Sequence, residues 1–283
     1  RAGKHTASVF ARRTGEGVRA DVAHVRQGHI VALRLYGRLG ALRSIMNYKN
    51  IEILYEDNHL LVVVKPQGVP SQADKSGDDD MLGMLKAYLK EKYDKPGNVY
   101  LGLVHRLDRP TGGVMVFAKT SKSASRLTEQ IKDGTLSKRY LAVLTARPAE
   151  KRGRLTHYLV KDEASNMVRV APMTTEGAKK AVLDYNILED NDEEGLYLAD
   201  IKLYTGRSHQ IRVQMATIGC PLFGDVKYGK NQPTGVFSLW SYDLSFRHPT
   251  TDKIMAFRVF PPERYPWTLF NLERHIGIVR PRD

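Results

Sequence analysis

The sequence predicts an α+β protein in which helices flank a mixed, largely antiparallel central sheet. Segments with strand-like alternation or short apolar runs outnumber segments with helical spacing along the 283 residues. Several of the predicted strands follow one another with no helix between them. This order argues against repeated strand–helix–strand units and favours antiparallel neighbours with helices packed on the sheet.

The first predicted elements begin just after residue 50. Residues 51–55 alternate as a strand does, and the apolar run 60–65 predicts a second strand beyond a polar turn. Leucines and a tyrosine recur at helical spacing over 82–89, directly after the acidic run 78–80. Acidic residues stabilise a helix N-terminus, so a helix is expected there.

Two more helices are predicted farther along the chain. One covers about 122–133 and is ended by Gly134, and the other covers about 207–218 and is ended by Gly219, because glycine readily adopts the left-handed conformation after a last helical turn. Further strands are expected at about 99–104, 114–118, 138–145, 154–160, 179–188, 196–204, 236–246 and 254–260. We find no internal repeat, so one domain over 50–283 is predicted.

Residues 1–49 form a separate, strongly basic extension. They hold eight Arg and two Lys against Glu16 and Asp21, a net +8 of the chain's +13. Apolar residues at 35, 39, 42 and 46 could make a basic amphipathic helix. Three interpretations stay open: an RNA-binding arm, an organellar transit sequence, or an upstream extension without function, with Met46 as the natural start.

Composition and charge narrow the class of protein. Hydrophobic residues make up 42% of the chain, which suits a globular domain, and the longest apolar run is far too short to span a bilayer. The positive charge attracts polyanions, nucleic acid first. A single cysteine, Cys220, excludes an intramolecular disulfide and predicts a reducing compartment, cytoplasmic or mitochondrial if residues 1–49 are a transit sequence. No long heptad is present, so a monomer is expected.

The densest group of reactive residue types is His105-Arg106-Leu107-Asp108-Arg109-Pro110-Thr111-Gly112-Gly113, between two predicted strands. Loops between strands commonly carry functional residues. Two guanidiniums flank one carboxylate, which favours its charged form and makes Asp108 a candidate nucleophile. A plain turn with a structural Asp–Arg pair is the alternative. Gly112 and Gly113 permit tight approach by another chain.

A second group, Thr205-Gly206-Arg207-Ser208-His209-Gln210-Ile211-Arg212, opens the predicted helix 207–218. Backbone N–H groups, a hydroxyl and two guanidiniums together make a receptor for a phosphate or carboxylate. Helical spacing places Arg212 beside the packed stripe, from which it could point into a site. A solvated basic helix end is the alternative. His105 and His209 have no metal-ligand spacing, so no metal is assigned, and no nucleotide-cofactor glycine pattern appears.

The ordered set of motifs is more specific than any one of them. It consists of Lys65-Pro66-x-Gly68, His105-Arg106-Leu107-Asp108-Arg109, Lys138-x-Tyr140-x-Ala142, Gly206-Arg207-Ser208-His209-Gln210-Ile211-Arg212 and Gly224-Asp225-x-x-Tyr228-Gly229. This set closely resembles the RluA-type family of pseudouridine synthases over about residues 51–262. The resemblance implies one catalytic domain on a mixed, mostly antiparallel sheet, no cofactor, and isomerisation of a uridine in structured RNA to its C5-glycoside.

The resemblance also implies residue roles. Asp108 would be the nucleophile that opens the glycosidic bond, and Arg106 would enter the RNA stack as the uridine is flipped out. Flipping is physically required, because a stacked base cannot present its sugar carbon to a carboxylate. Tyr140 would stack on the flipped base and is a candidate general base at the sugar, and Arg212 would pair with Asp108. RNA-contacting residues are expected to include Arg106, Arg109, Lys65, Arg207 and His209.

Departures from the family pattern leave the substrate open between ribosomal and transfer RNA. Pro110 and Gly113 stand where many members have an acidic residue and Ser, and Leu239-Trp240-Ser241 stands where many read Leu-His-Ala. An RNA-binding or RNA-folding protein without essential chemistry is the alternative function. A glycoside hydrolase is weaker, because such enzymes usually need two facing carboxylates, whereas only Asp108 has a site-like context.

Overall fold

The computed structural model describes residues 22–26, 29–34 and 48–277. In this part of the chain thirteen strands form a single sheet. They are β1 (Val22–Arg26), β2 (His29–Arg34), β3 (Glu52–Glu56), β4 (Leu60–Lys65), β5 (Gly102–Leu103), β6 (Gly112–Ala118), β7 (Ser137–Leu144), β8 (Arg152–Asp162), β9 (Met167–Val170), β10 (Lys179–Asn191), β11 (Leu196–Leu203), β12 (Leu239–Arg247) and β13 (Ile254–Val259).

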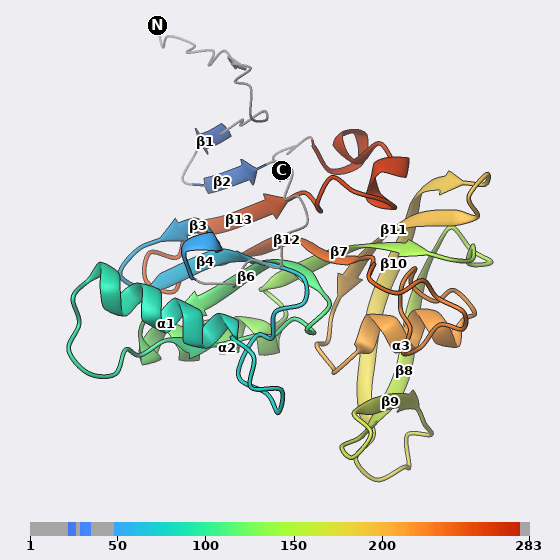
Figure 1. Cartoon of the computed structure of the whole chain (residues 1–283), viewed down its shortest axis with the longest axis horizontal. Helices are drawn as coiled ribbons and strands as arrows, with labels where there is room; N and C mark the ends of the chain where they lie inside the picture. Colours follow the sequence, from blue (N-terminus) through green and yellow to red (C-terminus); the bar gives the residue numbers. More distant parts are fainter. Residues whose placement is uncertain (1–21, 27–28, 35–47, 278–283) are drawn as a thin grey trace, which may run out of the picture.

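Helices are fewer among the described residues. The α-helices are α1 (Met81–Lys92), α2 (Ser121–Asp133) and α3 (Gln210–Thr217), and short turns of other helix types are η1 (Tyr48–Asn50), η2 (Trp267–Leu269) and η3 (Glu273–Gly277). The strands run β1-β2-β13-β12-β7-β11-β10-β8-β9, and β6 branches from β12 to pair with β4 and β5 (Figure 1). Only β12–β6 and β13–β2 are parallel among the pairs described, so the predicted α+β class with a largely antiparallel sheet is confirmed.

Both faces of the sheet are covered in its central part, where strands such as β4 and β6 carry continuous apolar runs. All six residues of β4 are buried, with Leu61 and Val63 in the core on one face and Leu60, Val62 and Val64 in the core on the other. Successive strand residues point to opposite faces, so a continuous apolar run fills two layers. Buried residues of α1 and α3 join the first core, and those of α2 join the second.

Local signals position the predicted helices. The Asp80 carboxylate accepts a hydrogen bond from the Gly83 N–H at 3.1 Å at the start of α1, as the acidic run predicted. Thr120 caps α2 in the same way through the Ser123 N–H, and Gly134 ends this helix with φ of +79°. Each cap satisfies a backbone group that the first or last turn leaves unpaired.

Several elements differ from the sequence prediction. The strand expected at 99–104 is only the two residues of β5, and β9 was not predicted. Helix α3 begins at Gln210 rather than 207, because His209 has a left-handed φ of +51° that the helix cannot continue. Strands β1 and β2 lie inside the basic extension, where no strand was predicted, and β2 pairs with β13. The helix suggested around 35–46 lies outside the described residues.

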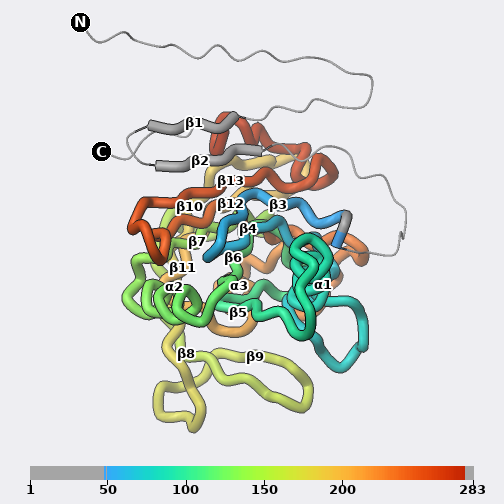
Figure 2. The backbone as a smooth tube through the Cα atoms, turned by 90° about the vertical axis from the view of Figure 1, so that its left-hand side faces the viewer, coloured from blue at the N-terminus to red at the C-terminus, as the bar shows by residue number. Residues whose placement is uncertain are grey.

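The β8–β9 hairpin extends away from the rest of the sheet, beyond α3 (Figure 2). Strand β10 pairs with both β8 and β11, which ties this hairpin to the central strand β7. No helix in the described part of the chain is long and apolar enough to cross a membrane. The motifs singled out in the sequence lie between this hairpin and α1, on the face that carries α3.

Candidate active site

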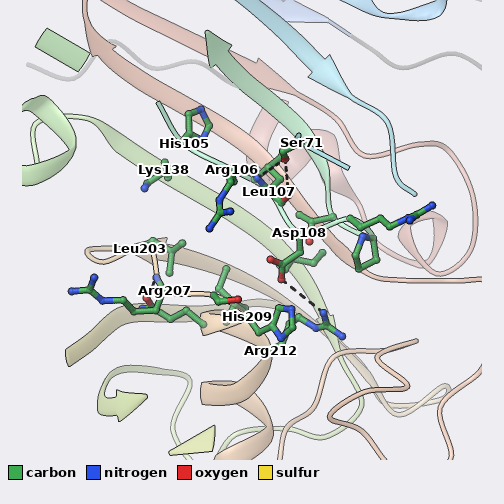
Figure 3. Close-up of a pocket in the computed structure, with 18 of the residues that line it drawn as sticks. Ser71, His105, Arg106, Leu107, Asp108, Lys138, Leu203, Arg207, His209 and Arg212 are labelled. Carbon is green, nitrogen blue, oxygen red and sulfur yellow. Dashed lines mark hydrogen bonds and ion pairs between the residues drawn. The ribbon is translucent and has the colours of Figure 1, made fainter. Parts of the chain in front are cut away.

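A cleft of about 1170 Å³ opens on the face of the sheet that carries α1 and α3. Most of its lining comes from the end of β5 and the β5–β6 loop, from β7, and from the segment that leads out of β11 into α3. The fold therefore brings together motifs that are about a hundred residues apart in the sequence. Figure 3 shows the β5–β6 loop facing the β11–α3 segment across the cleft.

Asp108 lies in the β5–β6 loop, with 28% of its side chain exposed to the cleft. The backbone on either side is held in place. Ser71 clamps the buried Leu107, because its hydroxyl accepts from the Leu107 N–H at 3.1 Å and donates to the Leu107 carbonyl at 2.7 Å. The Thr111 N–H donates to the Asp108 carbonyl at 2.9 Å. The carboxylate therefore projects from a constrained loop.

Arg212, in the first turns of α3, faces Asp108 from across the cleft (Figure 3). Its Nη1 lies 3.8 Å from the Asp108 Oδ2, the pairing that the resemblance implied. Shorter contacts go to Asp225, which accepts from the Arg212 Nε at 2.8 Å and Nη2 at 2.6 Å and is fully buried. The rings of Tyr228 and Phe237 lie about 5 Å from the guanidinium carbon. Arg212 is thus a rigid cation between two carboxylates.

Tyr140 lies on β7, between Ile201 of β11 and Ser241 of β12, and is 5% exposed. Its side chain lines the cleft. Burial, and next the charge of Asp108, raise the pKa of Tyr140 well above its usual value near 10. The phenol is therefore protonated at neutral pH and presents an uncharged aromatic surface.

Arg109 does not serve Asp108 as the sequence suggested. Its Nε donates to the Gly68 carbonyl at 3.0 Å, its Nη1 donates to the Ser76 hydroxyl at 3.1 Å, and its Nη2 is paired with Asp78. These partners follow β4 in the sequence, on the other side of the loop. Arg109 therefore fastens the segment 68–78 to the β5–β6 loop, and its guanidinium is already occupied.

Arg106 also makes no ion pair with Asp108, so neither neighbour in the sequence supplies the charge partner expected there. Its side chain is exposed and has no hydrogen bond or ion pair with any residue that the structure describes. Figure 3 shows it projecting toward the space between the two walls of the cleft. This placement suits a residue that contacts a ligand rather than the protein.

Lys65 is placed differently from an RNA-contacting residue. The side chain is completely buried, and its Nζ donates to the carbonyls of Pro66 at 3.0 Å, Val69 at 2.6 Å and Arg109 at 3.1 Å. Burial lowers the pKa of Lys65 to about 7. Lys65 lies outside the cleft lining, so the expected RNA contact does not fit the structure; the lysine ties the end of β4 to the site loop instead.

Arg207 and His209 lie on the opposite wall. Arg207 is exposed at the rim, where its Nε donates to the Lys180 carbonyl at 3.0 Å. His209 is buried, and its Nδ1 lies 2.6 Å from the Tyr228 hydroxyl, which already accepts from the Val168 N–H. Burial lowers the pKa of His209, which favours the neutral ring, and its contact with the hydroxyl holds Tyr228 beside Arg212.

Sequence reasoning gave no role to three residues that shape the site. Asp225 belongs to the motif that starts at Gly224. Its carboxylate was the signal in the sequence for a charge partner of Arg212. Lys138 stood two residues before Tyr140, where alternation along a strand places both on one face. Ser71 had no signal in the sequence, because its clamp on Leu107 joins segments that meet only in the folded chain.

A constrained carboxylate in a cleft lined by arginines and a buried tyrosine defines the class of protein: an enzyme that acts on a polyanion. The model of the family described as RNA pseudouridylate synthase matches residues 59–217. A relative from Bacillus subtilis (strain 168), an uncharacterized RNA pseudouridine synthase named YhcT, is 34% identical over 77% of this chain and 72% of its own length. The chain belongs to this family, and its activity is isomerisation of uridine to pseudouridine in RNA.

Other relatives and solved structures agree. Ribosomal large subunit pseudouridine synthase D from Zymomonas mobilis is 32% identical over 75% of this chain and 70% of its own length. The structure of human RNA pseudouridylate synthase domain containing 4 covers 77% of this chain and 91% of its own, with a TM-score of 0.63 and 23% identity. This structural likeness shows the shared fold, which the mixed sheet and its strand order already indicated.

Proposed function

We propose that this enzyme isomerises a specific uridine of a structured ribosomal or transfer RNA, with Asp108 as its nucleophile. The observation that carries the proposal is the Asp108 carboxylate, partly exposed in the cleft on a clamped loop and facing Arg212 at 3.8 Å. No other reactive side chain of the three cleft segments combines exposure to the cleft with a fixed cation opposite it, among the residues described.

In total two bonds break, N1–C1′ and C5–H, and two bonds form, C5–C1′ and N1–H; a bond between Asp108 and C1′ forms and breaks on the way. A carboxylate oxygen of Asp108 bonds to C1′ of the uridine, while the electrons of the N1–C1′ bond leave with the uracil. The uracil turns, its C5 bonds to C1′, and the carboxylate is released. C5 then loses its proton and N1 gains one, so substrate and product are isomers. No oxidant, reductant or second substrate is required.

The cleft supports this chemistry with charge and with an aromatic surface. Arg212 lies beside the carboxylate that attacks and is released, and Arg106 projects from the same loop into the open cleft, where it can occupy the gap left by a flipped base. The raised pKa of Tyr140 favours stacking on the base or sugar over removal of a proton, because a general base must be deprotonated first.

Ribosomal RNA is the first substrate to examine. Two relatives are named as ribosomal large subunit pseudouridine synthases, D from Zymomonas mobilis and C from Rickettsia bellii, at 32% and 31% identity. An identity of about 30% does not assign the target uridine of a relative to this chain. Transfer RNA therefore belongs in the same experiment.

The test is carbodiimide mapping of pseudouridines in total RNA from cells with the gene, without it, and with only the Asp108→Asn version. The substitution removes the nucleophile and hardly changes the shape of the side chain. We expect one or a few positions to be lost both without the gene and with Asp108→Asn, while the purified variant binds RNA with wild-type affinity.

Each other result has a definite meaning. A position restored by Asp108→Asn would refute the nucleophile assignment. If no position changes in cells and purified protein leaves ribosomal and transfer RNA transcripts unmodified, the chain binds RNA without modifying these classes, and the proposed substrates are wrong.

A further inference from the structure

Lys138 is a buried cation in the cleft that the reaction described above does not use. It lies on the central strand β7, in register with Leu203 of β11 and Leu244 of β12, and it is 8% exposed. The ammonium has no hydrogen bond or ion pair with any residue in the described part of the chain. Burial lowers the pKa of Lys138, and no carboxylate opposes this effect.

Lys65 shows how this protein accommodates a buried lysine elsewhere. The Lys65 ammonium donates to three carbonyls and feels the charge of Asp108. Lys138 has no such compensation. His105, a neighbour in the cleft wall, is uncharged at neutral pH, because burial and then the charge of Lys138 lower the His105 pKa to about 3. A buried charge without a partner is costly, so its retention in a cleft indicates an anionic ligand.

The surroundings of the ammonium suit such a ligand. A Cβ added at Gly206 would lie 3.4 Å from the Lys138 Nζ, which places the ammonium against the glycine of the loop that leads into α3. Figure 3 shows Lys138 and Arg106 reaching toward the same space from one wall, with Arg207 on the opposite wall.

The spacing between Lys138 and Tyr140 along β7 suits a nucleotide as the ligand. Lys138 and Tyr140 point to the same face of β7 and are separated by about 7 Å along the strand. The phosphates of a nucleotide lie one sugar away from its glycosidic carbon. A uridine whose sugar reaches Asp108 and whose base contacts Tyr140 therefore brings a backbone phosphate near the ammonium. Each RNA phosphate carries a full negative charge. Such a phosphate would supply the anionic partner that Lys138 does not find among the described residues of the protein.

We propose that Lys138 binds a backbone phosphate adjacent to the target uridine, beside Gly206, and thereby places the sugar over Asp108. This inference rests on the proposed function. One face of β7 would then bind two parts of the nucleotide. Tyr140 would contact the base or sugar, and Lys138 would bind the phosphate. The protein would thus hold the flipped nucleotide by its charged and aromatic parts while Asp108 reacts with the carbon between them.

The test uses an RNA stem–loop that contains the uridine found by mapping, together with copies that carry one uncharged methylphosphonate at the phosphate on its 5′ or its 3′ side. Lys138→Met removes the charge at nearly constant length. Lys151→Met is the matched control, because Lys151 is exposed and lies outside the cleft lining. The readouts are kcat/KM for each protein on each RNA, and the melting temperature of each protein.

We expect Lys138→Met to lower kcat/KM on the unmodified RNA at least tenfold and to leave the melting temperature unchanged or higher, since an unpaired buried charge is removed. At one of the two positions, the methylphosphonate should lower the kcat/KM of wild type and of Lys151→Met by a similar factor. The same methylphosphonate should leave the already reduced kcat/KM of Lys138→Met almost unchanged. This loss of additivity would locate the lysine at that phosphate.

Other outcomes overturn the proposal. A lower melting temperature with kcat/KM unchanged would show that Lys138 is structural. An equal methylphosphonate effect on wild type and Lys138→Met would show that the lysine contacts another part of the RNA. Turnover by wild type establishes the proposed function independently of either result, so the two failures are distinguishable.

Discussion

Asp225 is the residue whose importance the fold reveals most clearly. Its carboxylate is fully buried, accepts two hydrogen bonds from Arg212, and also accepts from the N–H groups of Lys227 and Tyr228. It therefore orients both the guanidinium opposite Asp108 and the turn that carries Tyr228. Asp225 thus positions Arg212, the cation that faces the proposed nucleophile.

We predict that Asp225→Asn lowers the free energy of unfolding by about 3 kcal/mol, because it leaves the Arg212 charge buried without its main partner. Activity should fall as well, since the guanidinium loses its orientation. Urea denaturation and single-turnover kinetics measure both effects. The matched control is Asp252→Asn, which breaks the exposed pair with Arg247 and should cost less than about 1 kcal/mol. Equal costs for the two variants would contradict the role of Asp225.

His105 makes the stability of the protein sensitive to acid. Its Nε2 accepts from the Val116 N–H at 3.1 Å, and burial with the charge of Lys138 lowers the pKa of His105 to about 3. The unfolded chain has a histidine pKa near ~6.5 and takes up a proton below that pH, whereas the folded chain does not. The stability from this residue is therefore complete above pH 6.5 and is lost as the pH falls toward 3.

Between pH 7 and pH 5 we expect wild type to lose about 2 kcal/mol of stability that His105→Gln does not lose. Glutamine keeps an acceptor for the Val116 N–H and has no titrating group. Urea denaturation at the two pH values gives the difference, and comparison within each protein cancels any cost of the substitution itself. Parallel losses in the two proteins would mean that His105 is not the residue responsible.

At the scale of elements, the contact between β6 and β12 shapes the site. These strands pair in parallel through Gly112 and Gly113, opposite Trp240 and Ser241. A Cβ at Gly112 would lie 2.2 Å from the Trp240 ring, and one at Gly113 would lie 2.2 Å from the Ser241 carbonyl oxygen. The sequence predicted that these glycines permit tight approach by another chain; the close contacts in the structure are instead with the Trp240 ring and the Ser241 backbone of the same chain. The junction determines where the Asp108 loop leaves the sheet.

We predict that Gly113→Ala destabilises the protein by about 3 kcal/mol or more, because Gly113 combines a φ of +119° with a blocked Cβ position. Gly134→Ala is the matched control. Gly134 also has a positive φ, of +79°, but nothing lies within 4 Å of its Cβ position, so about 1 kcal/mol is expected. Thermal unfolding compares the two, and similar shifts would show that steric blocking is unimportant.

Element prediction succeeded where a pattern is local and failed where partners are distant. The runs in β4 and β10 and the capped helix α2 carry their own periodicity or turn residues, so they were predicted within a few residues. Strand β9 has four residues and exists because β8 offers it a pairing edge. No short segment of sequence carries information about such an edge.

At the scale of the whole molecule, charge is unevenly distributed. Residues 1–49 carry +8 of the net +13, whereas the proposed site lies wholly in the remaining part of the chain. We predict that deleting residues 1–45 weakens RNA affinity and makes it less dependent on salt, because fewer phosphates are neutralised. Turnover at saturating RNA should stay near that of the full chain. Binding measured from 50 to 300 mM salt tests this, and an identical slope would exclude phosphate contacts by the extension.

The sequence by itself determined the family and the mixed sheet, because ordered motifs and side-chain periodicity are properties of the linear chain. It also singled out Asp108, the carboxylate that we propose as the nucleophile. The resemblance to the family already pointed to Arg212 as the partner of Asp108. Only the tertiary structure shows that the sequence neighbours Arg106 and Arg109 do not pair with Asp108, and that the buried Asp225 holds Arg212 in place. The tertiary structure also decided where the two lysines lie. Lys65 is completely buried and outside the cleft lining, whereas Lys138 is nearly buried but lines the cleft. Ion pairs depend on side-chain direction and on segments that meet only after folding, and no spacing along the chain specifies these.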